Sequence, residues 1–166
     1  MKKKIFLDLD GVFASFHEGV IEHTGKDISH FKGNDNLLWD SLRQIDNLFY
    51  TLPVLEGSQE MLDYLLSHDH DYEFLTAIPR PEGKLATAAD DKERWVRAHL
   101  TKTVPVSTVV GGKNKWKFLI KHPGAVLIDD YQRNLDLWAQ NGGISVLHTS
   151  PKNTVKTLQS LNLGFK

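Results

Sequence analysis

The stretch "IFLDLDGVF" (residues 5–13) decides how the rest of the chain is interpreted. It begins as an apolar run of strand length and places Asp8, Asp10 and Gly11 where that strand should end. Two carboxylates at the end of a buried strand need a chemical reason, because burying a charge without a partner costs free energy. The ends of the other strands supply that reason.

Four further apolar runs of strand length follow, at 72–76, 106–110, 125–129 and 144–148. Helical patterns occur between and after them, at 58–68, 90–100, 132–143 and 153–161. Apolar strands that alternate with amphipathic helices predict a parallel sheet covered on both faces. The predicted fold class is therefore α/β: a Rossmann-like, three-layer parallel sheet with helices on both faces.

Residues 15–55 interrupt this alternation directly after the first strand. The segment is rich in aromatic and polar residues, and its part 36–49 has a helical pattern. An insertion of this length is more than a loop. We therefore expect a small, mostly helical cap at 15–55, placed over the strand ends of a core domain formed by 1–14 and 56–166.

Composition and charge narrow the class of partner. Twenty basic residues face 21 acidic ones in a chain of 166 residues, so no strong field favours a long nucleic acid or an anionic membrane. The first apolar run is too short for a signal sequence or a membrane span. The chain has no cysteine, which excludes disulfides and thiolate metal sites and fits a reducing cytoplasm. We expect a cytoplasmic protein with a small-molecule partner.

Polar side chains mark the ends of three predicted strands. Asp8 and Asp10 end the first, Thr76 ends the second, and Asp129 with Asp130 ends the fourth. The carboxyl ends of neighbouring parallel strands meet at one edge of a sheet, where ligands bind. Several carboxylates gathered there repel one another, and a hard divalent cation such as Mg²⁺ removes the conflict.

A magnesium site built from carboxylates favours phosphate chemistry. One aspartate can attack phosphorus and a second can transfer the proton, while a threonine and a lysine can hold the phosphoryl oxygens. The segment "GGKNKWK" offers Lys113, Lys115 and Lys117 as the lysine. Each feature alone is commonly a turn or a helix cap, but their ordered occurrence at three strand ends favours the catalytic interpretation.

Four segments carry a resemblance to a known superfamily. They are "DLDGV" (8–12), "FLTAIPR" (74–80), the lysine-bearing segment 113–117 and "VLIDDYQRNLDLW" (126–138). Together they resemble the four ordered motifs of the haloacid dehalogenase (HAD) superfamily. The opening motif through Phe16, the segment 76–79, Trp138 and the glycine pair 142–143 are more closely similar to its 5'(3')-deoxyribonucleotidase branch, the type C cytosolic 5'-nucleotidases.

The resemblance implies a role for each matching residue. Asp8 would be the nucleophile and Asp10 the general acid and base. The implied metal ligands are Asp8, the backbone carbonyl of Asp10 and Asp129, with Asp130 as a supporting carboxylate. Thr76 would bind phosphate together with one lysine; we choose Lys115 and leave Lys113 and Lys117 open. Phe16 could stack on a nucleobase or form part of the core of the cap. Trp39 and Phe49 could also stack on a base, but they fit the core of the cap better.

The resulting expectation is a magnesium-dependent phosphomonoesterase. Its substrate would be a small nucleotide, a deoxyribonucleoside or ribonucleoside 5'-monophosphate, and the reaction would pass through an aspartyl phosphate. One alternative is a HAD phosphatase for another phosphorylated metabolite or for a polynucleotide 3'-phosphate end. Another is a non-catalytic phosphate-binding module. The presence of both a nucleophile and an acid argues against that module.

Overall fold

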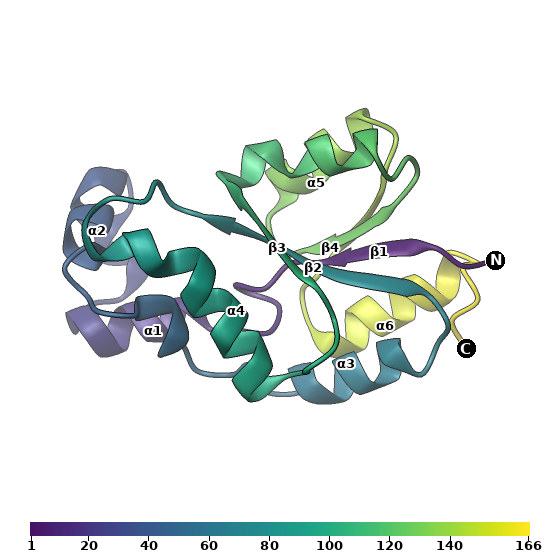
Figure 1. Cartoon of the computed structure of the whole chain (residues 1–166), viewed down its shortest axis with the longest axis horizontal. Helices are drawn as coiled ribbons and strands as arrows, with labels where there is room; N and C mark the ends of the chain where they lie inside the picture. The colour runs from purple at the N-terminus through teal and green to yellow at the C-terminus, as the bar shows by residue number, and fades with distance from the viewer.

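The computed structural model describes all 166 residues and contains one five-stranded sheet (Figure 1). The strand order is β3-β2-β1-β4-β5, and every pair is parallel. The strands are β1 (Lys4–Leu7), β2 (Asp71–Ile78), β3 (Val106–Val110), β4 (Val126–Asp129) and β5 (Ile144–Leu147). This confirms the predicted α/β class with a parallel sheet.

Helices cover both faces of the sheet, as Figure 1 shows for α5 on one side and for α3 and α6 on the other. The first face carries η4 (Gly112–Ile120) and α5 (Gln132–Gln140), and the second carries α3 (Ser58–Leu66), α4 (Ala88–His99) and α6 (Pro151–Ser160). Alternate residues of β1 divide between the two layers: Phe6 packs in the cluster of Trp138, whereas Ile5 packs in that of Trp95. No helix combines the length and the apolar character that crossing a bilayer requires.

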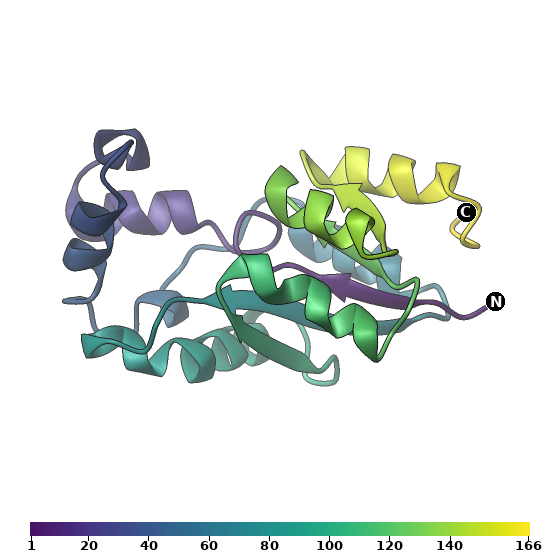
Figure 2. The same cartoon turned by 90° about the horizontal axis from the view of Figure 1, so that it is seen from above.

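Residues 15–55 add no strand to the sheet. They form α1 (Phe16–Thr24), η1 (Ile28–Phe31), α2 (Asp35–Leu42) and η2 (Leu48–Tyr50). Figures 1 and 2 place α1 and α2 beyond the carboxyl ends of the strands, at the end of the molecule away from both termini. We call this segment the cap; its division from a core domain stays a prediction.

Two sequence expectations on element bounds were wrong. The helical pattern at 36–49 does not form one helix: α2 ends at Leu42, and further along Asn47 has a left-handed backbone (φ 51°) that a right-handed helix cannot contain. The second strand does not end at Thr76, since Thr76 and Ile78 still pair with Thr108 and Val110 of β3. Thr76 therefore lies inside β2, two residues before the strand ends at Ile78.

The contact between the turn before β5 and α5 provides a test of the packing. A Cβ at Gly143 would lie 2.2 Å from Nε1 of Trp138, a fully buried indole. We expect Gly143→Ala to lower the free energy of unfolding by about 1–3 kcal/mol, measured by urea denaturation. Gly19→Ala, whose methyl meets only the end of the Leu52 side chain, should cost less. Equal losses for the two variants would contradict this packing.

Candidate active site

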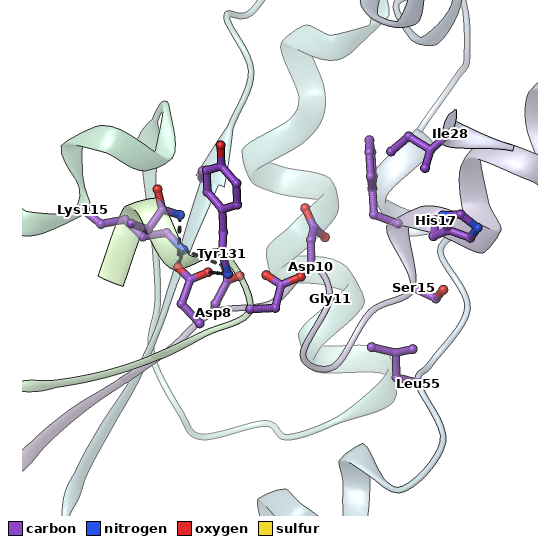
Figure 3. Close-up of a pocket in the computed structure, with 14 residues that line it drawn as sticks. Asp8, Asp10, Gly11, Ser15, His17, Ile28, Leu55, Lys115 and Tyr131 are labelled. Carbon is purple, nitrogen blue, oxygen red and sulfur yellow. Dashed lines mark hydrogen bonds and ion pairs between the residues drawn. The ribbon is translucent and has the colours of Figure 1, made fainter. Parts of the chain in front are cut away.

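Asp8 and Asp129 converge because their strands are neighbours. Leu7 of β1 is in register with Ile128 of β4, so the next residue of each chain segment lies at the same sheet edge. Lys115 of η4 joins them: its Nζ donates to Oδ1 of Asp8 and to Oδ2 of Asp129, each at 2.7 Å (Figure 3). The predicted convergence of the first and fourth strand ends is confirmed.

The carboxylates at this edge of the sheet carry more negative charge than the neighbouring ammonium group neutralises. Asp8, Asp129 and Asp130 each place one oxygen within 4.8 Å of the others. Three carboxylates against the one ammonium of Lys115 leave two negative charges when all are ionised. An all-oxygen donor set with this excess fits a hard divalent cation such as Mg²⁺. The side chain of Asp10 is not in this set.

The pKa shifts at the site have the same origin. Burial raises the pKa of Asp8 well above its usual range, and Asp129 and Asp130 add to the rise against the opposing charge of Lys115. Partial desolvation and the charge of Asp129 raise the pKa of Asp130 to about 6. The Asp8 and Asp129 carboxylates hold the pKa of Lys115 above its ordinary value, although burial works against its charge. Burial is thus the main cause of the two raised aspartate pKa values, and the neighbouring carboxylates add to it.

Gly11 lets Asp130 approach the other carboxylates. Its backbone has φ 81°, and a Cβ there would lie 1.9 Å from Oδ2 of Asp130. Only glycine adopts this positive φ without strain and also leaves room for the Asp130 carboxylate. The glycine of the opening motif is thus a steric requirement of the carboxylate cluster.

Lys92 of α4 is a site residue that the sequence analysis missed. Its Nζ donates to Oδ2 of Asp10 at 2.7 Å, to Oγ1 of Thr76 at 2.9 Å and to the carbonyl of Ala77 at 2.6 Å. The side chain is buried. A sequence signal existed: Lys92 falls on the apolar stripe of its helix, between Ala88 and Trp95, where a lysine needs a buried partner.

Asn134 of α5 is the second missed residue. Its Nδ2 donates to Oδ2 of Asp129 at 3.2 Å, and a Cβ on Gly112 would lie 2.8 Å from its amide. Oδ2 of Asp129 therefore accepts from both Lys115 and Asn134, whereas Oδ1 accepts only from the backbone N–H of Tyr131 at 2.9 Å. Oδ1 is the oxygen that keeps a free lone pair for a metal ion.

The three candidate lysines of η4 have different surroundings. Lys115 is buried at the carboxylates, whereas Lys113 and Lys117 are exposed. Thr76 is fully buried and contacts the site through Lys92. The structure thus brings Asp8, Asp129, Asp130 and Lys115 into one group and joins Thr76 to Asp10 in a second, adjacent one.

Two cavities at the sheet edge share Phe16 in their walls. The inner cavity, of about 450 Å³, holds the carboxylates, and its residues are drawn in Figure 3. The outer cavity, of about 740 Å³, lies between the cap and the loops after β2 and β3. Phe16 and Asp10 line both, and Phe16 packs against Phe49 and Trp39 with ring centroids 6.2 Å apart in each pair. Phe49 is buried in the cap core, while Phe16 and Trp39 keep accessible faces.

Comparison with known proteins assigns this arrangement to a family. Residues 24–160 match the family described as "5' nucleotidase, deoxy (Pyrimidine), cytosolic type C protein". A 5'(3')-deoxyribonucleotidase of Bacillus subtilis is 30% identical over 167 residues, which cover 92% of this chain and 88% of that protein. The chain belongs to this family. Membership in the type C nucleotidase family makes it a HAD-type phosphatase, which confirms the resemblance and the enzyme class predicted from the motifs.

Solved structures agree on the fold of this type C nucleotidase family member. A HAD-superfamily hydrolase from Ehrlichia chaffeensis superposes with TM-score 0.60 at 11% identity, covering 98% of this chain and all of that one. A D,D-heptose 1,7-bisphosphate phosphatase from B. bronchiseptica, complexed with magnesium and phosphate, gives 0.51 at 18% identity, covering 100% and 89%. At these identities the likeness establishes the shared HAD architecture.

Replacing Lys92 tests its contacts with Asp10 and Thr76. We expect Lys92→Met to lower the free energy of unfolding by about 1–3 kcal/mol, because Asp10 and Thr76 lose their charged donor. Adding Asp10→Asn to Lys92→Met should recover part of the loss, and the exposed Lys117→Met should be within about 0.5 kcal/mol of wild type. Urea denaturation measures all three. If Lys92→Met were as stable as Lys117→Met, the three contacts of Lys92 would contribute nothing.

Proposed function

We propose that this protein is a magnesium-dependent phosphomonoesterase that removes phosphate from a deoxyribonucleoside or ribonucleoside 5'-monophosphate. The observation that carries the proposal is the bridge from Lys115 to Asp8 and Asp129, with Asp130 uncompensated beside it. It leaves a place for one divalent cation and keeps Asp8 next to a cavity that can admit a substrate. The name of the Bacillus subtilis relative supports a nucleotide as the substrate.

Asp8, Asp129 through its free Oδ1, and Asp130 would hold Mg²⁺, together with the backbone carbonyl of Asp10. When bound, the ion screens the charge between the nucleophile and the phosphoryl group. Lys115 orients Asp8 and adds positive charge where negative charge develops. Thr76 of β2 and Lys92 of α4 are buried beside Asp10 and would hold the remaining phosphoryl oxygens.

The proposed reaction has two steps. An Asp8 oxygen attacks phosphorus while the bond from phosphorus to the ester oxygen breaks, and Asp10 gives its proton to that leaving oxygen. Asp10 then takes a proton from water, the water oxygen attacks phosphorus, and the bond to Asp8 breaks to release phosphate.

Asp10 is suited to the proton transfer. Its Oδ2 is bonded to Lys92, whereas its Oδ1 is buried without a hydrogen-bond partner. Since Asp10 lines both cavities, a leaving group in the outer cavity would lie beside it. Oδ1 is therefore the atom that we assign to proton transfer.

The outer cavity would hold the nucleoside. Phe16 and Trp39 offer aromatic faces on which a nucleobase can stack. The family description includes the word cytosolic, and a cytoplasmic location is part of the proposal.

Replacement of the nucleophile tests the reaction type. Asp8→Asn should lower kcat for thymidine 5'-monophosphate more than about 1,000-fold, because an amide cannot form the aspartyl phosphate. The matched control Asp63→Asn, an exposed acid on α3, should keep wild-type kcat. Steady-state phosphate release measures both, and a panel of sugar phosphates tests the substrate class. Turnover by Asp8→Asn near the wild-type rate would contradict the proposal.

Metal binding is tested without turnover. Mg²⁺ at millimolar concentration should raise the melting temperature above that in EDTA by about 2–8 °C, since an ion that binds only the folded state stabilises it. Asp129→Asn should remove the rise, and Asp63→Asn should retain it. An equal rise in Asp129→Asn would place the ion elsewhere.

A further inference from the structure

The outer cavity has two unlike walls. The cap contributes mainly aromatic and amide groups, and the core contributes the two loops that follow β2 and β3. The cap residues are Phe16, Asn36, Trp39, Arg43 and Phe49. On the core side, Arg80 follows β2, and Lys113 is the second residue of η4, which follows β3. The aromatic rings of the cap wall suit a base, and the opposite wall carries Arg80 and Lys113.

Arg80 and Lys113 have no ion-pair or hydrogen-bond partner for their side chains. Both are exposed. Other cations near this cavity are paired: Arg43 lies 3.5 Å from Glu82, and Lys84 lies 2.8 Å from Asp46. Glu82, the only acid of the outer wall apart from Asp10, is thus already engaged, as is Asp10 by Lys92. The wall therefore presents two free positive charges in a chain whose net charge is −1.

The sheet register brings the two loops together. Ile78 of β2 is in register with Val110 of β3, and the N–H of Gly111 donates to the carbonyl of Ile78 at 3.2 Å. Arg80 and Lys113 follow these paired residues by two and three positions. They leave the sheet from adjacent strand ends and line the same cavity.

An uncharged leaving group does not use two free cations. An arginine and a lysine on adjacent loops of one cavity are suited to a phosphate, which accepts charge-assisted hydrogen bonds from both. Resting on the proposed function, we propose that the preferred substrate is a mononucleotide with a second phosphate, such as a nucleoside 3',5'-bisphosphate. The scissile phosphate lies at Asp8, the base lies against the aromatic wall, and the second phosphate is bound by Arg80 and Lys113.

The experiment compares two substrates that differ by one phosphate. The kcat/KM for thymidine 3',5'-bisphosphate should exceed that for thymidine 5'-monophosphate about tenfold or more. In the double variant Arg80→Ala/Lys113→Ala this ratio should fall toward one. Lys117→Ala, an exposed lysine of the same η4 that lines neither cavity, should keep the wild-type ratio.

Each outcome decides between the two proposals. Efficient hydrolysis of the monophosphate with a ratio near one in the wild type, or a ratio unchanged by the double variant, overturns the second-phosphate site and leaves the proposed function intact. Absence of hydrolysis of both nucleotides overturns the proposed function itself. A stronger preference for a 3'-phosphorylated oligonucleotide than for the bisphosphate also overturns the inference, because the second anion would then belong to a polymer.

Discussion

The rest of the site depends on the position of one ammonium group. Nζ of Lys115 lies 2.7 Å from a carboxylate of β1 and 2.7 Å from a carboxylate of β4, and it is buried with both. It neutralises enough charge for two aspartates to remain inside the protein, but not enough to satisfy Asp130 as well. This remaining charge adds to the effect of burial in raising the pKa values of Asp8 and Asp130, and it accounts for the fit to a divalent cation.

The backbone around Lys115 is shaped to permit this charge cluster. Gly11 and Gly112 are the two positions where a Cβ would displace a side chain of the site, Asp130 in one case and Asn134 in the other. Lys92 balances the adjacent carboxylate of Asp10 and reaches it from a different helix. The two lysines thus bind different acids. Lys115 contacts Asp8 and Asp129, whereas Lys92 contacts only Oδ2 of Asp10 and leaves Oδ1 without a partner.

Sequence alone was sufficient to bring together the carboxylates at the ends of β1 and β4, but it misplaced Thr76, which lies inside β2. Asp8 and Asp129 could be placed together because neighbouring parallel strands end at one edge, and the order of motifs identified the superfamily. The choice among three lysines depended on how η4 turns over the sheet, which its sequence does not specify. Lys92 could have been found from its place on an apolar stripe. Asn134 had no comparable signal, because its contact with Asp129 depends on the space above Gly112.

The central claim is that Asp8 receives the phosphoryl group beside a metal ion held by the later aspartates. A crystal structure with Mg²⁺ and beryllium fluoride, which mimics a phosphoryl group on a carboxylate, tests it most directly. We expect beryllium on an oxygen of Asp8, Mg²⁺ on the opposite Asp8 oxygen and on Oδ1 of Asp129, and Lys115 and Lys92 near the fluorides. A mimic bound away from Asp8, or a metal ion that does not contact Asp129, would contradict the account.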